Sequence, residues 1–295
     1  MKRILVTGSN GQLGKTIQDL GPEYRGLDFN FTDKATLDIT QSEEVSRMFQ
    51  ELKPDYCINC AAYTQVDQAE RTPEPAFAVN VLGVENLVNA CVPHNTTLIQ
   101  ISTDYVFDGK KNEAYSPQDE TNPINVYGKT KLQGEDFIQK HIIQHFIIRT
   151  SWLYSEYGSN FYKTIRRLIA ENKTLNITGA ETGSPTHAMD LAHFILGILR
   201  SKHSAPYGIY HFCNTGSVSR YDFALEIVRI SHKVALDKLH KNNNYITFTP
   251  RPQYSVLDTS LTRKHFDVEI PEWKDSLENI KTGAFLKANK DRKTQ

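Results

Sequence analysis

A tyrosine and a lysine stand four residues apart in the segment Tyr127-Gly128-Lys129-Thr130-Lys131, which has the pattern of a helix. Residues four apart share one face of a helix, so the Lys131 ammonium ion can lie near the Tyr127 phenol. A nearby cation lowers the pKa of a tyrosine from its usual value of about 10. Such a phenol can donate a proton to a carbonyl oxygen during hydride delivery, and accept one in reverse. The alternative is a solvated helix face without chemistry.

Two hydroxyl side chains, Ser102 and Thr103, stand where the predicted strand 97–102 ends. In open α/β sheets, ligands bind beyond the carboxyl ends of the strands. We therefore expect one of these hydroxyls to hydrogen-bond the oxygen of a bound substrate and to share its charge with Tyr127.

A glycine-rich turn opens the chain. Gly8, Gly11 and Gly14 follow the predicted strand 4–7 and open the predicted helix 13–20. Glycines at these spacings let the chain turn sharply, let a pyrophosphate approach the backbone, and let the helix pack tightly on the sheet. The free N–H groups and the dipole of the helix then hold the anion. The motif predicts a dinucleotide site, and the alternative is a tight turn without a ligand.

A carboxylate that binds ribose hydroxyls is expected about 20 residues beyond such a turn. Asp33 fits, because it follows the second predicted strand, 28–32, whereas Asp28 lies near the start of that strand. A carboxylate here repels the 2′-phosphate of NADP and favours NAD, but Lys34 beside it could blunt that preference. The predicted cofactor is therefore NADH or NADPH, and a surface aspartate without a role is the alternative.

The elements that must position these groups alternate along the first half of the chain. Predicted strands cover residues 4–7, 28–32, 55–60, 97–102 and 146–150, and predicted helices cover residues 13–20, 42–52, 79–91 and 125–141. This alternation implies right-handed crossovers and a parallel sheet with helices on both faces. We predict an α/β fold with a doubly wound parallel sheet.

The second half has a less regular pattern. Helical periodicity covers residues 161–170, 190–199 and 219–231, the last opened by a capping box of Ser219 and Asp222. Residues 236–245 are polar and are predicted as a loop, and residues 287–295 as a frayed end.

Composition excludes several classes of protein. The 34 Lys and Arg residues equal the 34 Asp and Glu residues, so no basic surplus indicates nucleic acid. The apolar runs are shorter than the roughly 20 residues of a membrane span, and the N-terminus lacks the pattern of a signal peptide. The four cysteines suit a reducing compartment. We expect a cytoplasmic protein that binds neither nucleic acid nor membrane.

Cys57 and Cys60 form a C-x-x-C pair within the predicted strand 55–60. A redox pair would instead open a helix, and a metal site would need a second pair of ligands. We interpret the two thiols as inert and buried. His187 and His193 are interpreted as surface or packing residues.

The glycine turn, the Thr103 hydroxyl and the pair Tyr127 and Lys131 together resemble the extended short-chain dehydrogenase/reductase family, and more narrowly its dTDP-4-dehydrorhamnose reductases. Further similar stretches follow in the family's order: residues 59–70, 102–109, 125–131 with 134–135, 149–154, 183–186 and 251–258. The resemblance implies a Rossmann domain over about residues 1–180. A smaller, mostly substrate-binding lobe would cover about residues 181–295, with some segments returning to the first domain. The implied reaction is reduction of the C4 carbonyl of dTDP-4-dehydro-β-L-rhamnose by NADH or NADPH, giving dTDP-L-rhamnose.

The resemblance also implies roles for individual residues. The catalytic residues would be Thr103, Tyr127 and Lys131, with Lys131 also holding the nicotinamide ribose. The cofactor residues would be Gly8, Asn10, Gly11, Gln12, Leu13, Gly14, Asp33, Asp38, Ile39, Ala61, Ala62, Tyr63, Tyr127 and Lys131, with Asn80 in support. The substrate residues would be Thr64, Val66, Thr103, Tyr105, Phe107 and Trp152, and core packing is the alternative for Trp152.

Two other functions stay open on the sequence. One is a reductase or epimerase of the same extended family acting on another nucleotide sugar. The other is a non-catalytic regulatory subunit, like the reductase-like β subunit of methionine adenosyltransferase, because a fold does not fix a function. The expected partner is a nucleotide-sugar substrate, and a homodimer is left open. Some relatives hold magnesium at a dimer contact, but the acids Glu269, Glu272, Asp275 and Glu278 give no firm ligand pattern, so we predict no metal.

Overall fold

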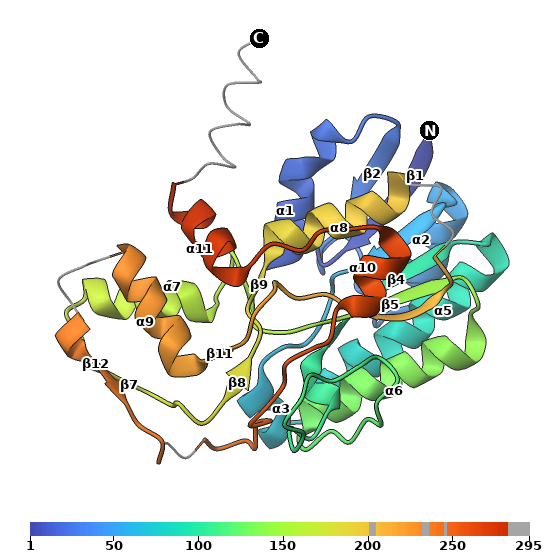
Figure 1. Cartoon of the computed structure of the whole chain (residues 1–295). Coiled ribbons are helices and arrows are strands. Elements are labelled where there is room, and N and C mark those ends of the chain that lie inside the picture. Colours follow the sequence, from blue (N-terminus) through green and yellow to red (C-terminus); the bar gives the residue numbers. More distant parts are fainter. Residues whose placement is uncertain (201–204, 232–235, 245–246, 283–295) are drawn as a thin grey trace, which may run out of the picture.

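A six-stranded parallel sheet forms the centre of the computed structural model, which describes residues 1–200, 205–231, 236–244 and 247–282 (Figure 1). Its strand order is β10-β5-β4-β3-β1-β2, and each pairing is parallel. The strands are β1 (Lys2–Thr7), β2 (Leu27–Phe31), β3 (Tyr56–Asn59), β4 (Thr97–Thr103), β5 (His145–Thr150) and β10 (Gly208–His211). The predicted fold class is confirmed.

Helices cover both faces of this sheet. On one face lie α1 (Gln12–Leu20) and α8 (Ala188–Arg200), and on the other lie α2 (Ser42–Leu52), α5 (Gly83–His94) and α6 (Val126–His141). Alternate residues of each strand serve the two faces. In β1, Ile4 and Val6 belong to the cluster under α1 and α8, whereas Leu5 belongs to the cluster under α2 and α5. Burial on both faces explains the continuous apolar runs of these strands.

The strand order reverses direction at β1. The chain moves from β1 outward to β2 on one side, and then returns to place β3 on the other side of β1. The connections therefore leave the carboxyl ends of β1 and β3 in opposite directions, which opens a crevice there. This crevice lies where the glycine turn was predicted to bind a dinucleotide.

A smaller lobe lies beside the sheet, at the left of Figure 1. It contains the helices α7 (Phe161–Ala170), α9 (Arg220–Ser231) and α11 (Trp273–Thr282), with the short strand pairs β7 (Leu175–Ile177) with β12 (Leu239–Lys241) and β8 (Thr182–Gly183) with β11 (Val218–Ser219). These helices share one hydrophobic cluster, to which Tyr162, Phe223 and Leu277 contribute. Helix α8 and strand β10 follow residue 180 and pack with the sheet, whereas α7 precedes residue 180 and lies in the small lobe. The predicted division into two domains near residue 180 stays a prediction.

Two elements differ from the sequence expectations. The polar segment predicted as a loop contains β12, which pairs with β7 and buries only Leu239 of its three residues. The sixth strand, β10, was not predicted, because its four residues lack a long apolar run and are fixed by pairing with β5. Residue 245 of the predicted loop and the predicted frayed end, residues 287–295, lie outside the described residues.

One helical stretch, Glu74–His94, is long and apolar enough to cross a membrane by length and composition, which the sequence reading did not identify. It consists of α4 (Glu74–Phe77), a π-helical turn (Ala78–Leu82) and α5. Half of its most apolar window is buried inside the molecule, and α5 packs against α2 and α6. A core helix of a globular protein can have the same length and apolar composition.

Helix α6 is held tightly against the sheet. The guanidinium of Arg149 donates to both carboxylate oxygens of Glu135, the shortest bond being 2.6 Å, and both side chains are almost fully buried. The Ser102 hydroxyl donates to the same carboxylate. Gly128 lets the helix approach still closer, because a Cβ atom there would lie 2.2 Å from the Tyr105 carbonyl oxygen. These contacts fix α6 against β4 and β5.

Replacement of Arg149 by methionine tests the weight of this ion pair. Arg149→Met leaves the Glu135 carboxylate buried without its cation, which should lower the free energy of unfolding by about 3–5 kcal/mol. Arg167→Met is the matched control, because Arg167 forms an exposed pair with Glu171 on α7 and should change the free energy of unfolding by less than about 1 kcal/mol. Urea denaturation measures both, and equal losses would contradict the role given to Arg149.

Candidate active site

The glycine turn has the close contacts that its motif predicts. Gly8 has a φ of 63°, and a Cβ atom there would lie 2.5 Å from the Ala61 backbone nitrogen. A Cβ atom on Gly14 would lie 2.5 Å from the Ser9 Cα atom. The turn therefore sits directly against the chain that leaves β3, at the crevice described above.

The start of α1 is free to bind an anion. Gly11 is its N-terminal cap residue and offers no side-chain cap, so the first N–H groups of the helix are left for a ligand. Leu13 is buried in the core under α1, so its backbone alone can take part. Asn10 donates a hydrogen bond to the Asp33 carboxylate. The side chain of Gln12 turns toward residues 155 and 160 instead.

Asp33 lies just beyond the carboxyl end of β2, as predicted. Its carboxylate accepts hydrogen bonds from the Ala35 and Thr36 backbone N–H groups and from the Thr36 hydroxyl. These bonds, with the Thr36 hydroxyl first, lower the pKa of Asp33 below its usual value. The carboxylate is therefore ionised near neutral pH and can accept hydrogen bonds from ribose hydroxyls.

The other predicted cofactor residues border the same crevice with unequal exposure. Asp38 is half-buried and accepts bonds from Thr40, while the Ile39 side chain is buried in the core and can offer only its backbone. Ala61, Ala62 and Tyr63 follow β3 and are half-buried. Asn80, from the π-helical turn, bonds the backbone N–H and C=O of Tyr63. It also donates to the Thr130 hydroxyl on α6, so it ties this loop to the helix that carries Tyr127.

A buried row of polar side chains under the crevice was missed by the sequence analysis. The Thr7 hydroxyl donates to the Asn59 amide oxygen at 2.6 Å, and the Asn59 amide nitrogen donates to Gln100 at 2.8 Å. The three residues come from β1, β3 and β4. Polar residues inside otherwise apolar strand runs were the available signal, and the row locks the carboxyl ends of these strands together.

Tyr127 and Thr103 meet at the carboxyl end of β4. The Thr103 hydroxyl lies near enough to the phenol to affect its pKa. Burial raises the pKa of Tyr127 well above its usual value, and the neighbouring Thr103 hydroxyl offsets part of this rise. Of the two predicted hydroxyls, Thr103 is therefore the one beside the phenol, because Ser102 points to Glu135.

Lys131 lies one helical turn beyond Tyr127 and is buried. Its ammonium ion donates to the Ile101 carbonyl oxygen at 2.6 Å. Burial lowers the pKa of Lys131 to about 8, against the opposing effect of the Glu135 carboxylate. The structure does not show the predicted lowering of the Tyr127 pKa by Lys131, because the ammonium ion is anchored on β4. Two of its three N–H donors are left for a ligand.

Asp104 is a further carboxylate that the sequence analysis did not select. It is buried, and its Oδ1 atom accepts a hydrogen bond from the Thr103 hydroxyl at 3.1 Å. Burial raises the pKa of Asp104 to about 6, while Ser255, Thr103 and Arg220 oppose the rise. Thr103 thus lies between a phenol and a carboxylate, and its single proton can be donated to only one of them at a time.

A cavity of about 390 Å³ opens beside these groups, between the sheet and the small lobe. The predicted substrate residues Val66 and Tyr105 line it, and the Tyr105 ring meets the Tyr127 ring edge-on at 5.7 Å. Thr64 is exposed near by, two residues before α3 (Val66–Arg71). Phe107 is fully buried elsewhere, stacked on Tyr115, so it does not line the cavity.

Two arginines of the small lobe also line this cavity and were not predicted. Arg220 opens α9, with its guanidinium 3.5 Å from the centre of the Trp152 ring and its Nε atom 3.4 Å from Glu181. Arg251 pairs with Asp67 across the cleft at 3.1 Å. Since these residues come from distant segments, only the fold brings them together.

Trp152 has an unusual backbone. Its φ of 46° lies in the left-handed region, which is rare for a bulky residue and costs energy. Its ring packs against Gly183, where a Cβ atom would lie 2.6 Å from the indole, and against Arg220. Trp152 is thus partly a packing residue, and it also forms a floor for the arginine that faces the cavity.

The remaining predictions concern cysteines, histidines and metals. Cys57 is buried in β3, and burial raises the pKa of the Cys60 thiol, as expected of inert thiols. His187 is fully buried between Glu156 and Asp190, a packing position rather than a surface one. In the described part of the chain, no three His, Cys, Asp or Glu residues gather as a metal site would require. The absence of a metal stays a prediction.

Comparisons with known proteins agree with this geometry. The family model described as the RmlD substrate binding domain matches residues 1–284. The dTDP-4-dehydrorhamnose reductase of Aggregatibacter actinomycetemcomitans is 36% identical over 293 residues, which cover 96% of this chain and 100% of that protein.

Solved structures give the same result. The dTDP-4-dehydrorhamnose reductase of Bacillus anthracis, solved in complex with NADP, is 37% identical with a TM-score of 0.89, covering 97% of this chain and 100% of that one. The corresponding protein from Clostridium acetobutylicum is 37% identical with a TM-score of 0.88, covering 97% and 99%.

The pH dependence of stability tests the burial of Asp104. Its pKa is raised from 3.8 to about 6 by folding, so the folded state binds more protons than the unfolded state between these values. Wild type should therefore lose stability relative to Asp104→Asn as the pH rises from about 4 to about 6, by on the order of 3 kcal/mol. Thermal or urea unfolding across this range measures the difference, and two parallel profiles would show that Asp104 is not buried as described.

Proposed function

This chain belongs to the RmlD substrate-binding family, and on that premise we propose that it is a reductase that converts dTDP-4-dehydro-β-L-rhamnose to dTDP-L-rhamnose with NADH or NADPH. The observation that carries the proposal is the placement of the Tyr127 phenol near the Thr103 hydroxyl at the carboxyl end of β4, next to Tyr105, which lines the cavity. Both hydroxyls can then reach one oxygen of a bound sugar.

The chain's own groups suit the dinucleotide. The close approach at Gly8 and Gly14 and the uncapped start of α1 form a cradle for a pyrophosphate, and Asp33 is placed for a ribose. When bound, the cofactor supplies the hydride. The Lys131 ammonium ion uses one N–H donor on the Ile101 carbonyl oxygen. Its other two donors would bind the hydroxyls of the nicotinamide ribose.

Tyr127 acts as the acid. The side chain is half-buried, and the loss of water around the phenol raises its pKa and keeps it protonated at neutral pH, as a proton donor must be. Before a sugar binds, the Thr103 hydroxyl donates its single proton to Asp104, which is a positioning residue. With a sugar bound, that proton turns to the same carbonyl oxygen, where Thr103 shares the negative charge that develops.

The nucleotide part of the substrate is bound by the small lobe. Arg220 is fixed by Glu181 and by the Trp152 ring, and faces the cavity with Arg251. A planar guanidinium binds phosphate oxygens through paired hydrogen bonds. We assign the diphosphate to these two arginines and the sugar to the space between Tyr105 and Trp152.

The rival functions predict different measurements. Another nucleotide-sugar reductase or epimerase would turn over a different sugar in a substrate panel, and a regulatory subunit would bind the cofactor without turnover. The combination of Tyr127, Thr103 and Lys131 favours catalysis. A homodimer and a cytoplasmic location complete the proposal, and light scattering and cell fractionation test them.

Replacement of Tyr127 tests the proton donor. Purified protein should consume NADH or NADPH with the dTDP-4-keto sugar, and Tyr127→Phe should lower kcat by about 10²–10⁴-fold because the proton donor is lost. Binding of the dinucleotide, measured by calorimetry, should stay nearly unchanged. Tyr56→Phe, at the amino end of β3, is the matched control. Turnover by neither cofactor in a folded sample would overturn the proposed function, and full activity of Tyr127→Phe would remove the phenol from its role.

Replacement of Arg220 tests the diphosphate site. Arg220→Met removes a charged hydrogen-bond donor from the diphosphate, so KM for the nucleotide sugar should rise by about 10–100-fold with a smaller change in kcat. Arg229→Met on the exposed side of the same helix should leave both constants near wild type. An unchanged KM in Arg220→Met would exclude Arg220 from substrate binding.

A further inference from the structure

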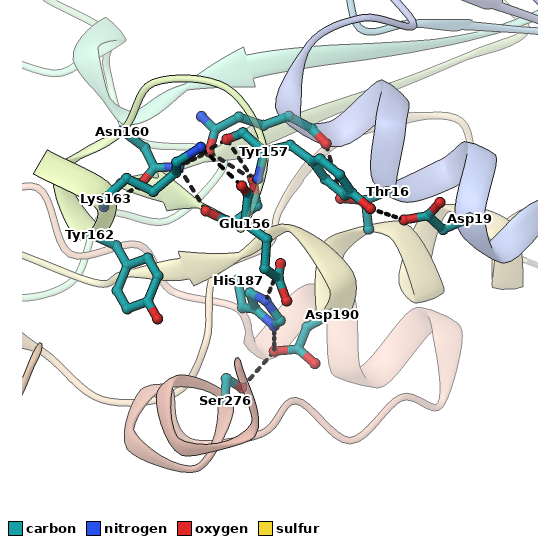
Figure 2. A network of polar contacts seen from close by, with 12 residues as sticks. Thr16, Asp19, Glu156, Tyr157, Asn160, Tyr162, Lys163, His187, Asp190 and Ser276 are labelled. Carbon is teal, nitrogen blue, oxygen red and sulfur yellow. Dashed lines mark hydrogen bonds and ion pairs between the residues drawn. The ribbon is translucent and has the colours of Figure 1, made fainter. Parts of the chain in front are cut away.

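A loop of six residues, 155–160, joins the two halves of the site. It follows β6 (Leu153–Tyr154) and leads directly into α7 of the small lobe. Its side chains reach back to α1, the helix that begins at the glycine turn. Figure 2 shows this arrangement, with Tyr157 and Asn160 lying between α1 and the elements of the small lobe.

The first connection is made at the first residue of α1. The Gln12 side-chain oxygen accepts hydrogen bonds from the Asn160 amide at 2.7 Å and from the Ser155 hydroxyl at 3.0 Å. The loop also approaches Gln12 closely, since a Cβ atom on Gly158 would lie 3.2 Å from the Gln12 Cγ atom. Gln12 is the first residue of α1, beside the glycine turn, and these contacts tie its side chain to the loop.

The second connection lies further along α1. The Tyr157 hydroxyl donates a hydrogen bond to the Asp19 carboxylate (Figure 2). From the other side, the Lys163 ammonium ion donates to the Glu156 carbonyl oxygen at 3.1 Å, and Glu156 faces the buried His187. The loop is thus held mainly by side-chain hydrogen bonds, to α1 on one side and to α7 on the other.

Asn160 has two separate roles in these contacts. Its side-chain oxygen accepts from the Lys163 backbone N–H at 2.9 Å and so caps the start of α7, while its side-chain nitrogen donates to Gln12. The next residue, Phe161, lines the substrate cavity and lies 5.3 Å from the Arg220 guanidinium. One amide group therefore touches the cofactor turn with one atom and the cavity-lining helix with the other.

We propose that Asn160 is a positioning residue that couples the two binding sites, because it grips Gln12 at the cofactor turn while it caps α7 beside the sugar cavity. A dinucleotide that fixes the start of α1 fixes the loop and the first turn of α7 as well. The nucleotide sugar then meets a cavity wall that is already ordered, so the two ligands bind with positive coupling. This coupling rests on the proposed function for its second ligand.

Asn160→Ser separates the two roles of the side chain. Serine caps a helix about as well as asparagine, but it is too short to reach Gln12. The variant should therefore fold with α7 capped and lose the contacts of the amide nitrogen, which are the bond to Gln12 and the bonds to the Ser155 and Tyr157 carbonyl oxygens inside the loop. Gln12→Met removes the link to the cofactor turn and leaves the two bonds inside the loop in place. Arg167→Gln, an exposed change on the same helix, is the matched control.

Hydrogen exchange with NADP⁺ alone tests the link without any sugar. In the full wild-type chain, saturating NADP⁺ should slow exchange in residues 155–164 by at least about 5-fold, the lower end of typical couplings. Asn160→Ser should show no such slowing, although it still binds NADP⁺, and Arg167→Gln should behave as wild type. Unchanged exchange in wild type, or equal slowing in Asn160→Ser, would overturn the proposal.

Calorimetry measures the coupling itself with dTDP as the probe. Saturating NADP⁺ should lower the Kd of dTDP by about 5-fold or more in wild type, and by clearly less in Asn160→Ser. Gln12→Met should reduce the coupling by the same factor, and the double variant should lose no more than either single one, because both remove one contact. A double variant that loses the sum of the two single losses of coupling would contradict the proposal. A wild type that shows no dTDP binding would contradict the proposed substrate, and the exchange experiment would still decide on Asn160.

Discussion

The close docking of α6 on the end of β4 is the constraint on which the site depends. It brings the Tyr127 phenol to the Thr103 hydroxyl and the Lys131 ammonium ion to the Ile101 carbonyl oxygen. The buried pair of Glu135 and Arg149 holds the helix there, one turn beyond Lys131. Such a pair contributes little net stability compared with apolar packing, but losing one partner is costly. The same contacts that keep α6 in place therefore keep the reacting groups in register.

The two lobes contribute different chemistry to one cleft. The sheet and its helices offer glycines, uncapped N–H groups and the Tyr127 phenol near the carboxyl ends of the strands. The small lobe offers cations on a rigid support, with Arg220 between Glu181 and the Trp152 ring. A hydride donor and a charged sugar nucleotide can thus meet at Tyr127 without sharing the same binding groups. The left-handed backbone of Trp152 is the strain that the small lobe's packing has to support.

Much of the fold was predictable because its signals are local. Strand runs buried on both faces, the glycine spacing and the four-residue step from Tyr127 to Lys131 each need only a short window of sequence. Arg220, Asp104 and the row of Thr7, Asn59 and Gln100 were not selected, because their roles arise from contacts between distant segments. The expected effect of Lys131 on the Tyr127 pKa was also wrong for this structure. The four-residue spacing places the two side chains on one helix face, but the hydrogen bond to the Ile101 carbonyl oxygen of β4 sets the position of the Lys131 ammonium ion.

A crystal structure of the chain with NADP⁺ and dTDP-L-rhamnose would test the central claim most directly. The quantity to measure is the distance from the sugar O4 atom to the hydroxyl oxygens of Tyr127 and Thr103. Both oxygens should lie within about 3.2 Å of O4, since a proton donor must be in hydrogen-bond reach. A complex in which O4 lies away from both hydroxyls, while the sugar occupies the cavity, would contradict it.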